Sequence, residues 1–158
     1  MELSTKGRYA VMAMAELARS GTSGAVPLAE IAERQQIPQA YLEQIFLKLR
    51  RNGLIESERG RSGGYRLARP ACTIAVWEVM AAAEEAVGMT RCSRESPGGC
   101  VHEERCLTHN LWHALSEHIR DFLDRVTLQD VLDGVPLGGM PAGMVRPLPL
   151  GALGGAAE

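Results

Sequence analysis

Residues 26–69, VPLAEIAERQQIPQAYLEQIFLKLRRNGLIESERGRSGGYRLAR, decide the fold predicted for this chain. The segment opens with a short helix begun by Pro27, a residue that a helix accepts in its first turn. That helix stops near Pro38. A second helix, from Gln39 to Asn52, has apolar residues at steps of three and four and ends at an Asn-Gly pair. Two short helices joined by a tight turn predict a helix-turn-helix.

A hairpin is predicted directly after these helices. Residues Leu54–Glu58 and Tyr65–Ala68 have the pattern of two short strands, and the RGRSGG between them supplies the glycines of a turn. Upstream, residues Thr5–Arg19 have apolar side chains at helical spacing, and Gly21 ends the pattern. Three helices followed by a hairpin predict a mainly α fold, a winged helix-turn-helix with a two-stranded wing.

The charges are divided unevenly between the two halves of the chain. Residues 1–72 carry 11 Lys or Arg against 7 Asp or Glu, whereas residues 73–158 carry 6 against 12. A basic half suits a polyanion, and the helix-turn-helix makes double-stranded DNA the predicted partner. The residues expected at the DNA are Gln39, Ala40, Glu43, Gln44, Lys48 and Arg51 on the second helix of the motif, Arg59 and Arg61 at the wing tip, and Arg66 and Arg69 on the return strand.

Each of these residue types has a definite chemistry at DNA. Arg and Lys pair with guanine or phosphate, and Gln pairs with adenine. The carboxylate of Glu43 accepts only from a donor such as cytosine N4, and it repels phosphates. Glu43 is therefore expected to select which operator sequences are tolerated.

The second half of the chain is predicted to contain two more helices and a tail. Residues 75–86 form the first helix, and residues 106–126 form a long one of about 30 Å. The long helix has an apolar stripe that so small a domain cannot cover, which favours a homodimer over packing within one chain. Residues 134–158 include 7 Gly and 4 Pro and are expected to be disordered.

Between these helices lies a cysteine-rich run, residues 90–112, TRCSRESPGGCVHEERCLTHNLW. Cys92, Cys100, Cys106 and His109 provide four soft ligands, the last two on one face at a helix start. This set suits a [2Fe–2S] cluster or Zn²⁺, with free redox thiols as a third reading. Three further histidines, His102, His113 and His118, are expected on the surface, and the lone Cys72 is expected in the core.

Composition limits the remaining classes of protein. The chain has 158 residues, 46% hydrophobic and 23% charged, which fits a folded domain. No stretch is long and apolar enough for a membrane span, and the first residues lack a signal-peptide core, so a cytoplasmic location is expected. No second cofactor motif is visible, so an enzyme is not expected.

With the wing and the cysteines in place, the sequence resembles the IscR-type iron–sulfur cluster-sensing winged-helix regulators. The resemblance covers about residues 1–133, and it rests on LSTKGRYAVMAM, VPLAEIAERQQI, YLEQIFLKLRRNGLIESERG, GGYRLAR, IAVWEVM, TRC and CLTHNLW. It implies a homodimeric regulator, mainly a repressor and sometimes an activator, of genes for iron–sulfur cluster assembly. The assembly machinery would donate the cluster.

The resemblance also assigns residues and boundaries. It implies that Cys92, Cys100, Cys106 and His109 hold a [2Fe–2S] cluster, and that Lys6, Arg8, Tyr41, Glu43, Gln44 and Arg59 contact DNA. The expected organisation is a DNA-binding domain at 1–72, a linking helix at 73–91, a cluster-binding loop at 92–109, a dimerisation region at 106–133 and a tail at 134–158.

Two positions depart from the family pattern. Seven residues separate Cys92 from Cys100 where the family has about five, at a loop-closure cost of only about 0.3 kcal/mol. Ala40 stands where the family tends to have Ser, so one hydroxyl contact is missing. A related regulator responding to nitric oxide or iron, and a zinc-stabilised DNA-binding or structural module, remain as alternatives.

Overall fold

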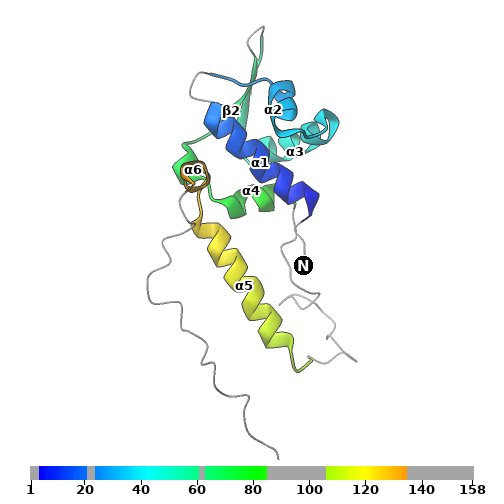
Figure 1. Ribbon diagram of the computed structural model, residues 1–158, viewed down its shortest axis with the longest axis vertical. Helices are drawn as coiled ribbons and strands as arrows, with labels where there is room; N and C mark the ends of the chain where they lie inside the picture. The colour runs from blue at the N-terminus through cyan, green and yellow to red at the C-terminus, as the bar shows by residue number, and fades with distance from the viewer. Residues whose placement is uncertain (1–3, 21–23, 61–62, 85–105, 135–158) are drawn as a thin grey trace, which may run out of the picture.

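The computed structural model describes residues 4–20, 24–60, 63–84 and 106–134 (Figure 1). In chain order the elements are α1 (Thr5–Ser20), α2 (Leu28–Gln35), α3 (Gln39–Arg51), β1 (Ile55–Glu58), β2 (Gly64–Leu67), the 3-10 turn η2 (Ala71–Thr73), α4 (Val76–Ala82), α5 (His109–Arg125) and α6 (Leu128–Asp133). The described part is mainly helical, with one antiparallel two-stranded sheet. The predicted winged helix-turn-helix is confirmed.

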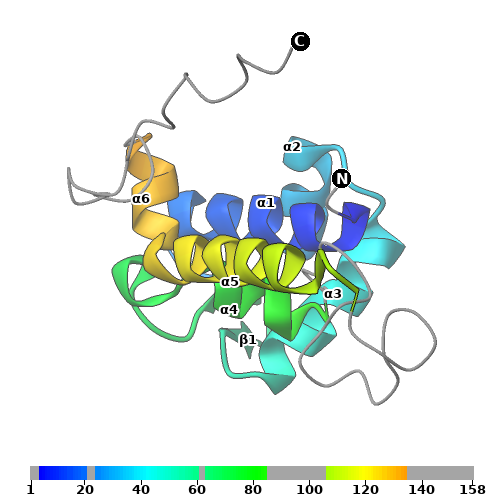
Figure 2. The same cartoon turned by 90° about the horizontal axis from the view of Figure 1, so that it is seen from below.

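The core forms where α1 crosses the helix-turn-helix and α4. Met14 and Leu17 of α1 are fully buried together with Phe46 and Leu49 of α3. These are the apolar positions that repeat at helical spacing in the sequence, so the face of α3 opposite them is left for solvent. Figure 2 shows α1 lying along the molecule, with α3 and α4 beneath it.

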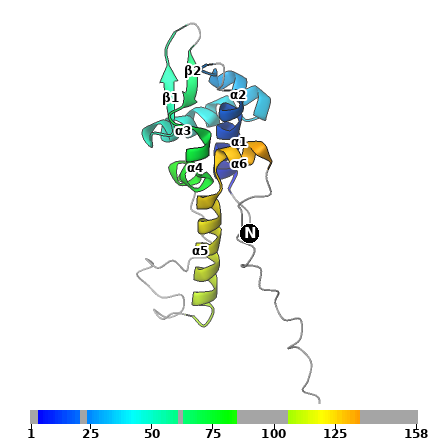
Figure 3. The same cartoon turned by 90° about the vertical axis from the view of Figure 1, so that its left-hand side faces the viewer.

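The hairpin projects from the helical body as a wing (Figure 3). Its two strands pair from Ile55 with Leu67 to Glu58 with Gly64. Tyr65 of β2 and Val26 exchange two backbone hydrogen bonds of 2.8 Å, which form an isolated β-bridge between the wing and the segment before α2. This pairing fixes β2 of the wing relative to α2.

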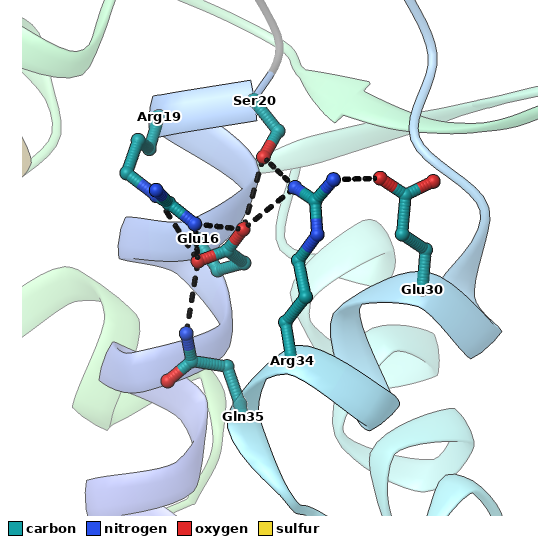
Figure 4. Close-up of polar contacts among 6 residues, drawn as sticks. All are labelled: Glu16, Arg19, Ser20, Glu30, Arg34 and Gln35. Atoms are coloured by element: carbon teal, nitrogen blue, oxygen red, sulfur yellow. Dashed lines mark hydrogen bonds and ion pairs between the residues drawn. The ribbon is translucent and has the colours of Figure 1, made fainter.

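A cluster of polar side chains joins the end of α1 to α2 (Figure 4). The carboxylate of Glu16 is almost fully buried and accepts hydrogen bonds from Arg19 at 2.8 Å, Arg34 at 3.1 Å, Ser20 at 3.0 Å and Gln35 at 2.9 Å. Burial alone would raise the pKa of Glu16, but the bonds from the two arginines and Ser20 lower it from 4.5 to about 2. The buried charge is therefore fully paired and holds the two helices together.

α5 is attached to the body at its C-terminal end. The Val76 N–H donates to the Val126 carbonyl at 2.8 Å, and the Leu128 N–H donates to the Ile74 carbonyl at 2.9 Å. These bonds join the start of α4 to the turn between α5 and α6. From this junction α5 extends away from the wing, as Figures 1 and 3 both show.

Several elements differ from the predictions. α4 ends at Ala82 and is followed by a turn in which Glu84 has φ 57°, so the helix is shorter than expected. α5 begins at His109 rather than at Cys106. The helix α6 was not predicted, although Thr127 and Asp130 form a capping box that the sequence contains.

The prediction that Cys72 lies in the core is wrong, because its side chain is exposed. Cys72 is the middle residue of the turn η2, which follows Pro70. Ile74, two residues after Cys72, takes the buried position. The tail expected to be disordered is residues 134–158. Gly134 is described and ends α6, whereas residues 135–158 lie outside the described residues.

Candidate nucleic-acid interface and cysteine segment

The outer face of α3 carries exposed polar side chains beside the wing. Gln39, Ala40, Glu43 and Gln44 are all exposed, opposite the buried stripe of the same helix. The Gln39 side-chain amide donates to the Glu43 carboxylate at 3.1 Å. Glu43 is thus oriented along the helix surface by a residue of the same face, one turn away.

The start of α1 lies next to the start of α3. Tyr41 is half-buried, and its ring meets the ring of Tyr9 edge to face with centroids 5.8 Å apart. The guanidinium of Arg8 lies 5.8 Å from the centre of the Tyr9 ring and remains exposed. This packing brings the predicted contacts from α1 and α3 to one side of the molecule.

The arginines of the wing fall into two groups. Arg59 is exposed and has no hydrogen-bond or ion-pair partner within the described ranges of the chain. Arg66 instead pairs with carboxylates of β1, at 2.5 Å from Glu56 and 2.8 Å from Glu58. Arg61 lies outside the described residues. Of the described wing cations, Arg59 is the one available to a phosphate.

Arg69 is directed back onto the body rather than outward. Its guanidinium donates to Glu78 at 2.7 Å and to the Thr73 carbonyl at 2.6 Å. Glu78 also accepts the Ala75 N–H at the start of α4. The structure therefore gives Arg69 a role in joining the wing to α4.

Two lysines of the interface pair with a residue that no sequence pattern selects. Lys6 of α1 and Lys48 of α3 both form ion pairs with Glu84, which follows α4. The partners are 78 and 36 residues apart in sequence. No local pattern marks contacts over such separations.

Of the four predicted metal ligands, the structure describes two. Cys106 is half-buried, and the buried His109 begins α5. The backbone N–H of His109 donates to the Cys106 carbonyl at 3.0 Å. Cys92 and Cys100 lie outside the described residues, and within residues 4–20, 24–60, 63–84 and 106–134 no three His, Cys, Asp or Glu side chains form a metal-binding group. Cys106 and His109 lie within one helical turn, which fits a thiolate and an imidazole binding one group.

The remaining histidines of α5 differ in their surroundings. The His113 ring stacks with the His109 ring at 6.4 Å between centroids, whereas His118 is exposed. His102 lies outside the described residues.

In the part of the chain that the structure describes, no helix has the length and apolarity to cross a bilayer.

The exposed face of α3, flanked by a wing with a free arginine, defines a winged-helix DNA-binding protein. Comparison with known proteins gives the family. Residues 3–134 match the model of the Rrf2 family, described as iron-dependent transcriptional regulators, and the chain belongs to this family.

Named relatives agree with this assignment. The chain is 50% identical to the HTH-type transcriptional regulator IscR of Klebsiella pneumoniae (strain 342) over 133 residues, which are 84% of this chain and 80% of the relative. Among solved structures, T. potens IscR has 35% identity and a TM-score of 0.70, covering 85% of this chain and 88% of that one. CymR, the global cysteine regulator of B. subtilis, has 29% identity and a TM-score of 0.71, covering 85% and 98%. The protein is a DNA-binding transcriptional regulator.

Proposed function

We propose that the protein is a cytoplasmic homodimeric regulator, mainly a repressor, that senses iron–sulfur status and controls genes for iron–sulfur cluster assembly. The observation that carries the proposal is that the buried His109 begins α5 within one helical turn of Cys106, with its backbone N–H bonded to the Cys106 carbonyl, while the other end of the helix is bonded to α4. Relatives named IscR, 50% identical over most of the chain, support it.

The ligand set proposed for a [2Fe–2S] cluster is Cys92, Cys100, Cys106 and His109. Three thiolates and one imidazole are soft donors suited to such a cluster, and the neutral histidine makes the site less negative than an all-thiolate one. When bound, the cluster is an iron-containing group whose occupancy reports the supply of iron–sulfur clusters. The iron–sulfur assembly machinery is the proposed donor.

In this proposal the chain's own residues carry the signal to DNA. Cys106 and His109 hold the start of α5, and the bond from the Val76 N–H to the Val126 carbonyl connects its end to α4. Glu43, held by Gln39, opposes one class of operator in the cluster-free protein. Unchanged selectivity of the apo-protein among operators after Glu43→Ala would remove this part of the proposal.

The test is the metal content of protein purified without oxygen. We expect about two irons and two acid-labile sulfides per chain, as a [2Fe–2S] site requires, with most of both lost in Cys106→Ala and His109→Ala. His118→Ala is the matched control, because it removes an exposed imidazole from the same helix. Stoichiometric zinc without sulfide would leave the DNA-binding regulator and contradict cluster sensing.

A second candidate is a regulator of the same family that responds to nitric oxide or to iron. The longer spacing between Cys92 and Cys100 favours it, because a longer loop gives small molecules easier access to the bound group. Reaction of the loaded protein with nitric oxide, followed in the visible spectrum, separates it from the first proposal.

A further inference from the structure

Glu84 lies at a junction of three elements that belong to different parts of the molecule. It follows α4, and its carboxylate Oε2 pairs with Lys48 of α3 and, at 3.5 Å, with Lys6 of α1. Figure 2 shows the start of α1, α3 and the end of α4 close to one another on this side. One carboxylate therefore faces two cations of the DNA-reading side.

The exposure of the three side chains shows how the charges are arranged. The side chains of Lys6 and Lys48 are 28% and 27% exposed, whereas that of Glu84 is 68% exposed. The pairing raises the pKa of Lys48 and lowers the pKa of Glu84, so both groups are charged at neutral pH. One of the two positive charges of Lys6 and Lys48 is thus compensated within the chain before any phosphate approaches.

The backbone supports this position of Glu84. Its φ of 57° places a non-glycine residue in the left-handed region, a conformation that costs free energy unless the surroundings offset it. The turn ends α4 and directs the chain so that Glu84 reaches both lysines. The two ion pairs of the Glu84 side chain offset the cost of this φ. A glycine would adopt the same φ more easily but could form neither pair.

We infer that Glu84 is an intramolecular competitor of DNA phosphate for Lys6 and Lys48, and that it sets the electrostatic part of the affinity for DNA. The inference rests on the DNA-binding function of the chain and not on the cluster. A phosphate oxygen and the Glu84 carboxylate are alternative acceptors for the same ammonium groups. While Glu84 is in place, these two lysines contribute less to binding than their position allows.

The test compares the wild-type full chain with Glu84→Gln on a short DNA duplex of mixed, non-operator sequence. Binding is measured by fluorescence anisotropy at several salt concentrations. Because each lysine–phosphate contact adds about 0.9 to the slope of log K against log salt, we expect the slope of Glu84→Gln to steepen by about 1 to 2 per protomer. At low salt we expect binding about 3- to 10-fold tighter, since an exposed ion pair competes only weakly.

Two controls make the result specific to this position. Glu117→Gln changes the net charge by the same amount at an exposed site on α5, and it is expected to keep the wild-type slope within error. The double variant Glu84→Gln with Lys48→Gln is expected to lose most of the gain. Glu84→Asn, whose residue tolerates a positive φ, is expected to behave like Glu84→Gln and covers the case in which glutamine disturbs the turn.

Equal slopes for Glu84→Gln and Glu117→Gln would overturn the inference. Weaker binding by Glu84→Gln, with an unchanged thermal unfolding curve, would also overturn it, because Glu84 would then be holding the lysines in a binding position. Failure of every variant, and of the wild type, to bind any duplex would instead contradict the DNA-binding function itself.

Discussion

At the scale of single residues, Glu16 is the buried charge on which the junction of α1 and α2 depends. Four neighbouring donors satisfy its carboxylate, and its pKa is held at about 2. Removing one partner from a buried ion pair leaves the others uncompensated, which costs more than the pair contributes. The sequence places Glu16 inside a helix without showing that it faces inward.

Glu16→Gln is expected to lower the free energy of unfolding by about 2–3 kcal/mol at pH 7, because a neutral amide cannot balance two arginines. The folded pKa is below the unfolded value of 4.5, so this stability is present above pH 4.5 and is lost as the pH falls toward 2. Urea denaturation at pH 7, 4 and 3 should therefore show the two proteins converging. Glu117→Gln is the control. A stability difference between wild type and Glu16→Gln that stays the same from pH 7 to pH 3 would contradict the prediction.

At the scale of elements, the position of the wing depends on a close approach of two backbones, those of β2 and of the segment before α2. A Cβ added at Gly64 would lie 2.3 Å from the Val26 carbonyl oxygen. That backbone cannot retreat without breaking the two 2.8 Å bonds between Val26 and Tyr65. The glycine is required by packing here, since its φ is not positive.

Gly64→Ala is expected to destabilise the protein by about 2 kcal/mol or more, through loss of this pairing, and to weaken DNA binding with it. Thermal unfolding and anisotropy on one duplex measure both effects. Gly53→Asn is the matched control, because Gly53 has open space around it and a φ of 70° that asparagine accepts. Wild-type stability in Gly64→Ala would show that the Val26 backbone can move away from β2 without cost.

The elements that the sequence predicted are those with a local signal. Apolar spacing located α1, α2 and α3, and paired turn residues located the hairpin. The pairs of Glu84 with Lys6 and of Arg69 with Glu78 were not predictable, because they form only after the chain has folded back on itself. Of the proposed ligands, Cys106 and His109 could be placed within one turn of each other near the start of a helix from spacing, whereas the burial of His109 depends on tertiary packing.

At the scale of the whole molecule, α5 leaves part of its apolar face exposed in the described part of the chain, although Leu123 packs against Val76 and Met80 of α4. His109 is its one buried residue, and the side chains of Leu111 and Phe122 are 59% and 38% exposed. A helix of this amphipathicity is stable in water when a second apolar face covers it. A twofold partner would also present two wings to two half-sites.

Leu111→Asp is expected to convert a dimer into a monomer, because it places an unpaired charge in the proposed interface. Sedimentation velocity at micromolar concentration measures this change, and far-UV circular dichroism checks that the fold is retained. Asn110→Asp adds the same charge at the exposed preceding residue and should leave the dimer intact. A dimer of Leu111→Asp as stable as wild type would show that α5 is not the interface.

In the described part of the chain, the backbone bonds that attach α5 to the body lie at its C-terminal end, so the helix acts as a lever. Its 17 residues span about 25 Å from the bonded junction at Val126 to His109. By that length, a tilt of about 10° at the junction displaces the far end by roughly 4 Å. A change of a few ångströms around Cys106 therefore corresponds to a modest rotation of the domain that carries the wing. Operators that differ in the angular phase of their half-sites, rather than in their bases, would report that rotation most directly.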